Sequence, residues 1–201
     1  MYSLSEIETT SKRASKAAGY SWGMAEEIGK ATSSLELFGL LGVKNLNLYL
    51  NIIKEKHPQK ISKIKRENKH DKLCPIYCGV AFLDQVQEIE SLRKITFYNL
   101  SYPILILAFI SKASEVSGKK ILVQFANSSF LMNFNKSILT KNLDSQVIAS
   151  ASEISIEILD NEDSFSNYEW QELYKLSEKT FVEESDSLKE KGAGAGLLDN
   201  D

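Results

Sequence analysis

Four carboxylates have positions in this chain that acid–base chemistry could use. Glu26 lies near the start of a predicted helix, Asp84 directly follows an apolar run, and Asp199 and Asp201 lie in the last three residues. A carboxylate held close to a substrate can act as a general acid or a general base. The structural alternatives are that Glu26, like its neighbour Glu27, interacts with the positive end of a helix dipole, and that Asp84 caps a turn.

The last ten residues are the least ordinary stretch of the chain. They alternate glycine with alanine and then place two leucines before an acidic end, as Gly192-Ala193-Gly194-Ala195-Gly196-Leu197-Leu198-Asp199-Asn200-Asp201. Glycine lets a backbone approach another group closely, and buried leucines would anchor such a segment. We therefore expect an ordered tail that closes a pocket, with a flexible tail as the alternative. The ligand-binding residues predicted for this pocket include Trp22, Glu26, Gly192, Gly194, Gly196 and Asn200.

Histidine and cysteine are too scarce here to indicate a metal site. The set is His57, His70, Cys74 and Cys78, and its spacing, His-x12-His-x3-Cys-x3-Cys, matches no common zinc site. Cys78 lies in an apolar run, where a buried and inert thiol is the usual interpretation. We expect no metal. The glycine-alanine tail is not a dinucleotide fingerprint, because no helix follows its glycines, and the cofactor, if any, is unknown.

A lysine-rich stretch follows the predicted N-terminal helices. Residues 54–72 hold eight basic and three acidic residues, and both histidines fall in or beside them. That location argues against a Ser-His or Cys-His mechanism. The stretch has one arginine and no Phe, Trp or Tyr, whereas nucleic-acid sites favour both arginine and aromatic residues. We therefore predict a solvated surface loop and no nucleic-acid partner.

The elements that must position these residues follow from periodicity and capping signals. Helices are predicted from Ser3 to Gly19, from Ser21 to Gly39, from Asn45 through Ile53 with an end before Pro58, from Pro103 to Gly118 and over 167–179. Strands are predicted over 76–83, 94–98, 120–126, 130–134 and 146–159, with the third and fourth paired as a hairpin through Asn127-Ser128-Ser129. On the last strand, Ile154, Ile156 and Ile158 alternate with Ser155 and Glu157, which indicates one buried face and one wet face.

This order of elements predicts an α+β fold. N-terminal helices would pack with a mixed, largely antiparallel sheet, and a C-terminal helix would precede the ordered Gly/Ala tail. The length of 201 residues fits a single domain. Its parts would be a helical part (1–56), a basic loop (57–74), strands around one apolar helix (75–160), and a helix with the tail (161–201).

Three segments together resemble a bacterial family of uncharacterised proteins, domain of unknown function 3726. The segments are Trp22-Gly23-Met24-Ala25-Glu26-Glu27-Ile28-Gly29-Lys30-Ala31, Gly79-Val80-Ala81-Phe82-Leu83-Asp84 and the ten-residue tail. The family has an aromatic and serine-rich lead-in to the tail, which Thr180-Phe181-Val182 and Ser185 fit. The resemblance therefore adds Ser185 to the predicted ligand-binding residues, and it implies no activity.

Composition bounds the class of protein. Hydrophobic residues make up 43% of the chain and charged residues 25%, which is typical of a soluble globular protein. The longest apolar run, Ile104 to Ile110, is seven residues long and too short to span a membrane. We expect a cytoplasmic protein, because two cysteines fit a reducing compartment and no secretory signal is recognisable.

Two functional hypotheses remain open at this point. In the first, the protein binds or processes a small polar metabolite in a pocket closed by the C-terminal tail. In the second, it is a non-catalytic accessory or assembly protein whose tail docks into a partner subunit. A homo-oligomer or a partner enzyme would fit either hypothesis, and whether the protein is an enzyme stays open.

Overall fold

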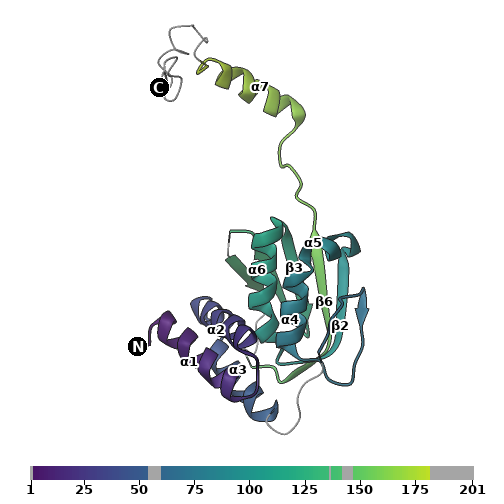
Figure 1. The fold of residues 1–201 in the computed structure, drawn as a ribbon. Coiled ribbons are helices and arrows are strands. Elements are labelled where there is room, and N and C mark those ends of the chain that lie inside the picture. The colour runs from purple at the N-terminus through teal and green to yellow at the C-terminus, as the bar shows by residue number, and fades with distance from the viewer. Residues whose placement is uncertain (1, 54–59, 136, 142–146, 182–201) are drawn as a thin grey trace, which may run out of the picture. The chain divides into compact units, whose positions relative to one another are not determined.

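The structure, a computed structural model, describes residues 2–53, 60–135, 137–141 and 147–181. The chain divides into two compact units, Met1–Asn161 and Glu162–Asp201. The first unit holds a bundle of N-terminal helices and a sheet, and the second contains helix α7 (Asn167–Glu178) (Figure 1). The predicted α+β fold is confirmed, whereas the predicted ordered tail at 192–201 lies outside the described residues.

Three helices open the chain, and local capping sets where they begin. They are α1 (Leu4–Ala17), α2 (Trp22–Leu37) and α3 (Gly42–Ile53). The predicted capping box is present, because the Glu6 carboxylate accepts from the Ser3 backbone N–H at 2.8 Å. The Ser21 hydroxyl caps α2 by accepting from the Met24 N–H at 3.3 Å. Helix α3 begins at Gly42, three residues before the predicted start at Asn45.

The predicted strand over 76–83 is wrong, because these residues lie in helix α4 (Pro75–Asp84). Pro75 occupies the first turn, where its missing N–H costs nothing. The Cys74 Sγ caps the helix by accepting from the Tyr77 N–H at 3.4 Å. An apolar run of this length is compatible with either a buried strand or a buried helix, so periodicity alone misassigned it. Short helical turns follow, α5 (Val86–Ile89) and η1 (Glu90–Leu92).

The described strands form one sheet in the order β1-β2-β6-β3-β4-β5. Their bounds are β1 (Glu67–Asn68), β2 (Lys94–Ser101), β3 (Lys120–Phe125), β4 (Ser128–Asn133), β5 (Ser137–Lys141) and β6 (Ser150–Leu159). The pairing of β1 with β2 is parallel, and the other pairings are antiparallel. The predicted mixed and largely antiparallel sheet is therefore confirmed.

Two details of the sheet differ from the predictions. Residues Ala126 and Asn127 connect β3 to β4, whereas the predicted connection is Asn127-Ser128-Ser129. Ala126 takes a φ of 49°. Strand β1 lies inside the predicted basic loop, where its two residues pair with Thr96 and Phe97. Two paired residues are too few to leave a periodic signal in a lysine-rich stretch.

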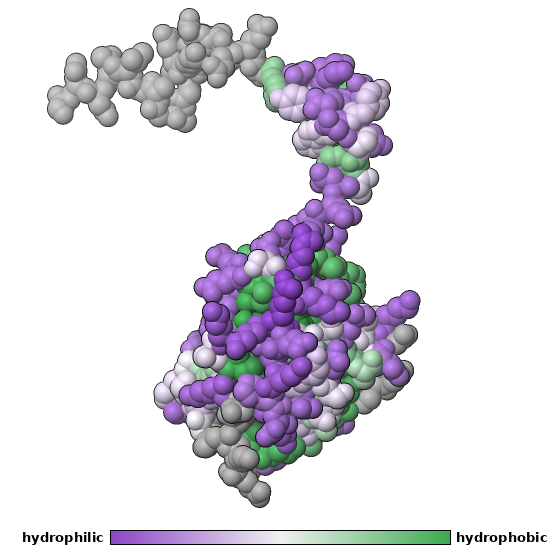
Figure 2. Space-filling model, turned by 90° about the vertical axis from the view of Figure 1, so that its right-hand side faces the viewer, coloured by the Kyte–Doolittle hydropathy of each residue, from purple (hydrophilic) through white to green (hydrophobic). Residues whose placement is uncertain are grey.

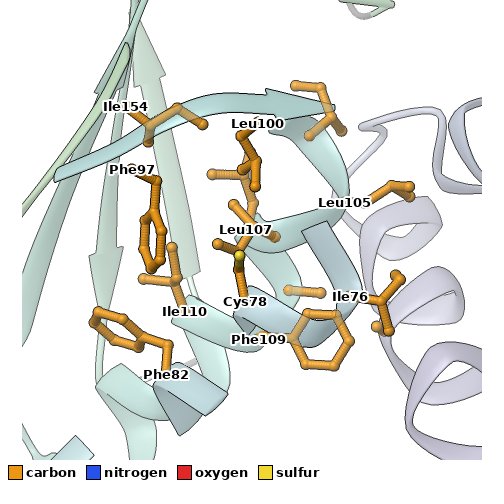
Figure 3. Packing of buried hydrophobic residues seen from close by; sticks show 14 of the residues in the cluster. Ile76, Cys78, Phe82, Phe97, Leu100, Leu105, Leu107, Phe109, Ile110 and Ile154 are labelled. Carbon is orange, nitrogen blue, oxygen red and sulfur yellow. The ribbon is translucent and has the colours of Figure 1, made fainter. Parts of the chain in front are cut away.

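One face of the sheet packs against helices, and described side chains on the other face are partly exposed. Figure 1 shows α4 and α6 (Leu107–Ser117) side by side across the sheet. Ile154, Ile156 and Ile158 of β6 are buried, as predicted, while Ser155 and Glu157 point to the other face and are partly exposed. In Figure 3, side chains from the sheet (Phe97, Leu100, Ile154) gather with side chains from α4 and α6 (Cys78, Phe82, Ile110).

The predicted apolar helix after residue 102 is confirmed as η2 (Pro103–Ile106) continuing into α6, which ends at Gly118 with a φ of 65°. Its packing partner α4 comes very close at Gly79. A Cβ built on Gly79 would overlap the ring of Phe109. The close approach of the two helices therefore requires a glycine at position 79, whereas the backbone conformation there does not.

We expect Gly79→Ala to destabilise the protein by about 1–3 kcal/mol, because overpacking a rigid contact outweighs the gain in helix propensity. Gly23→Ala is the matched control, since nothing lies within 4 Å of a Cβ at that helical position. The control should be neutral or more stable by up to about 1 kcal/mol. Urea unfolding of both variants measures the difference, and a Gly79→Ala protein as stable as the parent would show that the two helices can move apart.

Candidate functional site

The described candidate residues lie at the surface. Trp22, the first residue of α2, is 58% exposed, and the Lys16 ammonium lies 5.4 Å from its ring centroid. Glu26 is exposed and pairs with Lys12 at 3.6 Å and Lys30 at 3.8 Å. Asp84 is exposed at the end of α4. The remaining candidates lie outside the described residues, namely Ser185, Gly192, Gly194, Gly196, Asp199, Asn200 and Asp201.

A groove of about 500 Å³ lies between α2, the end of α4 and α6. Small side chains leave the space open, because α2 contributes Ala31 and Ser34 while α6 contributes Ala108 and Ser111. Larger apolar side chains complete the lining (Leu37, Phe38, Leu83 and Phe109). Neither Trp22 nor Glu26 lines this groove, whereas Glu27 does.

Two ion pairs form the charged part of the groove lining. On α2, the Lys30 ammonium lies 3.0 Å from the Glu27 carboxylate, and on α6 the Lys112 ammonium lies 2.8 Å from the Glu115 carboxylate. The hydrogen bond to Glu27 raises the pKa of Lys30. The groove therefore combines an apolar surface with equal numbers of positive and negative groups.

A buried cluster of polar side chains joins the N-terminal helices to α4. The Tyr49 hydroxyl donates to the Cys74 Sγ at 2.9 Å, and the Tyr20 hydroxyl lies 3.7 Å from the same sulfur. Tyr102 packs its ring 5.9 Å from that of Tyr49. Sequence reasoning missed this cluster, because Tyr20, Tyr49 and Cys74 come from separate elements with no shared spacing.

The chemistry of this cluster is structural. Burial raises the pKa of the Cys74 thiol, although hydrogen bonds from Tyr49 and the Tyr77 N–H act in the opposite direction. Burial likewise raises the pKa values of Tyr20, Tyr49 and Cys78. A reactive cysteine needs an accessible thiolate. Both thiols are buried, and their raised pKa values disfavour the thiolate form that reactivity requires.

The described residues contain neither a metal-ligand cluster nor a membrane span. No group of three or more His, Cys, Asp or Glu side chains there is placed to hold a metal ion. His57 lies outside those residues, and His70 is exposed, with its carbonyl accepting from the Asn99 side chain at 3.1 Å. Within the same part of the chain, no helix has the length and apolar character that crossing a membrane requires.

Comparison with known families gives a match at the N-terminal end. Residues 2–74 match the family described as "Protein of unknown function (DUF3726)". This match confirms the predicted resemblance over that range, which contains Trp22, Glu26 and the Tyr20–Tyr49–Cys74 cluster. The segments 79–84 and 192–201, which also carry the predicted resemblance, lie beyond it. No curated protein matches the chain.

The buried cluster predicts that the protein loses stability in alkali. Free thiols and phenols ionise near pH 8.5 and 10 in an unfolded chain, whereas burial raises the pKa values of Cys74, Cys78, Tyr20 and Tyr49 in the fold. The stability that these four groups contribute is therefore fully present below about pH 8.5. It is lost as the pH rises further, because only the unfolded state releases these protons.

The measurement is the free energy of unfolding in urea between pH 7.5 and 10.5. Each buried group contributes a slope of up to about 1.4 kcal/mol per pH unit once its unfolded form ionises. Cys78→Ala removes one such group, so its curve should be shallower above pH 8.5, whatever its offset at neutral pH. A parent protein equally stable at pH 7.5 and pH 10 would contradict the prediction.

Proposed function

We propose that this is a cytoplasmic, non-catalytic accessory or assembly protein that docks onto a partner protein through helix α7. The observation that carries the proposal is the row of large apolar side chains along one face of that helix. Two free and buried thiols, Cys74 and Cys78, are compatible with a reducing compartment. The apolar face of α7, its N-terminal capping box and its acidic charge support the docking role.

The stripe runs along one side of α7. Trp170, Leu173 and Tyr174 share the i, i+3, i+4 spacing of one helical face, with exposures of 48%, 61% and 46%. Ser177 continues the same face. Phe165 extends it before the helix, where its ring stacks on Trp170 with centroids 5.6 Å apart. Such a row of anchors is the form in which an amphipathic helix enters the apolar groove of another protein.

Helix α7 begins with a capping box. The Glu169 carboxylate accepts from the Ser166 N–H and from the Ser166 hydroxyl, each at 2.7 Å, and the Ser166 hydroxyl accepts in return from the Glu169 N–H at 3.2 Å. This capping box lets the segment begin a helix without help from the sheet. A helix of 12 residues is nevertheless marginal alone in water, so binding would supply the stability it lacks.

Charge narrows the kind of partner. Within α7, the acidic residues Glu169, Glu172 and Glu178 outnumber Lys175, which already pairs with Glu172 at 3.0 Å. An apolar groove with a basic rim would complement this helix, and like charges on a partner would oppose it. We therefore infer a partner whose groove is bordered by lysine or arginine.

Catalysis has less support among the described residues. A general acid or base works from a site that holds it against the substrate. Glu26 is instead exposed and shared between two lysines, and Asp84 is exposed at a helix end. Neither residue lines the groove between α2, α4 and α6. These observations favour an accessory role over an enzymatic one.

Two double variants of identical composition test the docking role. Tyr174→Ser/Leu173→Ser removes the centre of the stripe, whereas Tyr168→Ser/Leu176→Ser removes the same residue types from other faces of α7. A photo-crosslinking residue at Ser177 should capture a specific protein in cells. That adduct should be lost in the first variant and kept in the second, and the purified partner should bind the first at least tenfold more weakly.

Several outcomes would count against the proposal. Equal loss in both double variants would indicate that only the helix, and not its stripe, is required. A crosslink at Gln171, off the stripe, that equals the crosslink at Ser177 would contradict a face-specific dock. Binding that strengthens as salt is raised would contradict the inferred basic rim.

A further inference from the structure

We propose that the groove between α2, α4 and α6 binds a zwitterionic small molecule with a bulky apolar body, of which an aromatic amino acid is the simplest example. This binding site is separate from the docking helix, because its lining residues all belong to the first unit. The two proposals therefore stand or fall independently.

The apolar body of the ligand follows from the inner surface of the groove. Leu37 is 65% exposed, and Phe38 and Leu83 are partly exposed, so these three side chains offer apolar surface to a ligand. The other apolar lining residues, Ala31, Ala108 and Phe109, are buried. Phe109 cannot move toward α4, because its ring already packs against the backbone at Gly79. The surface is thus preformed, and binding would cost little reorganisation.

The size of the groove suits a small molecule that has an apolar body. A space of about 500 Å³ falls within the range of ordinary small-molecule sites. It is larger than a water cluster needs, and it accommodates an aromatic or branched side chain together with its polar end. An ion without an apolar body would leave the apolar lining unused.

The ligand's charge follows from the groove's charged residues. The lining contains two positive groups, Lys30 and Lys112, and two negative groups, Glu27 and Glu115. A simple anion would face both glutamates, and a simple cation would face both lysines. A molecule that carries one ammonium and one carboxylate meets partners for each of its charges and leaves the net charge of the groove at zero.

The existing ion pairs do not block such a ligand. Both lysine side chains are 53% exposed. Lys30 pairs with Glu27 and also with Glu26, and Lys112 pairs with Glu115, whose side chain is 27% exposed. Ion pairs within one helix whose lysine is half exposed contribute little to stability. A ligand carboxylate can therefore recruit a lysine, and a ligand ammonium a glutamate, at small cost to the protein.

The experiment is a titration of the isotope-labelled full chain with L-phenylalanine, followed by amide NMR. We expect saturable shifts at groove positions such as Ala31, Ser34 and Ser111. Two analogues isolate the charges, since 3-phenylpropanoate lacks the ammonium and 2-phenylethylamine lacks the carboxylate. Each analogue should bind at least tenfold more weakly than L-phenylalanine.

Matched variants locate the site. Ser34→Phe places a ring in the groove and should abolish the shifts. Ser33→Phe makes the same change one residue earlier on α2, outside the lining, and should leave binding intact. Lys112→Gln should weaken binding, whereas Lys94→Gln, which alters an exposed pair on the sheet, should not.

Three results would overturn the proposal. The first is the absence of saturable binding of L-phenylalanine to the parent protein. The second is an analogue that binds as tightly as L-phenylalanine, because a single charge or the ring alone would then suffice. The third is equal binding to the Ser34→Phe and Ser33→Phe proteins, which would place the ligand elsewhere on the surface.

Discussion

The turn η2 and the first half of helix α6 are buried on nearly every side, and this constraint organises the first unit. From Tyr102 to Ser111 every residue is buried, because the segment packs against the N-terminal helices, α4 and the sheet. An apolar segment of this kind must be covered all round. The N-terminal helices cover one part of it, and strands β3 and β4 cover another. The first unit therefore cannot be divided into an independent helical part and an independent sheet.

The same constraint produces the groove. Helices α2 and α6 meet with small residues between them, and the close contact at Gly79 fixes Phe109 against α4. What remains uncovered is a hollow with an apolar surface and two ion pairs. The apolar lining contrasts with much of the outer surface, since Figure 2 shows a side of the molecule on which hydrophilic residues predominate.

Much of the fold could be predicted from local signals. The capping box at Ser3, the alternation on β6 and the stop at Gly118 each express a short-range rule, and each is confirmed. The error at residues 76–83 arose where the local signal is degenerate, because a wholly buried helix and a wholly buried strand share one apolar pattern. Strand β5 (Ser137–Lys141) was missed because it is a short edge strand with most of its residues exposed.

The candidate site was harder to predict, for a physical reason. The groove joins residues 27–38, Leu83 and residues 108–115, and only tertiary packing brings these positions together. The sequence directed attention to Glu26, whereas the groove is lined by the next residue, Glu27. The Tyr–Cys cluster is likewise assembled by packing between elements. Helix α7 is the opposite case, since helical spacing alone places Trp170, Leu173, Tyr174 and Ser177 on one side.

Docking through α7 requires that its apolar stripe be free in the isolated protein. Hydrogen exchange of the full chain measures this directly, because amide protection reports local opening. We predict that amides from Phe109 to Ala113 in α6 are protected on the order of a thousand-fold more than those from Leu173 to Ser177 in α7. Comparable protection of the two helices would contradict docking through α7, because the stripe would then already be covered and inaccessible to a partner.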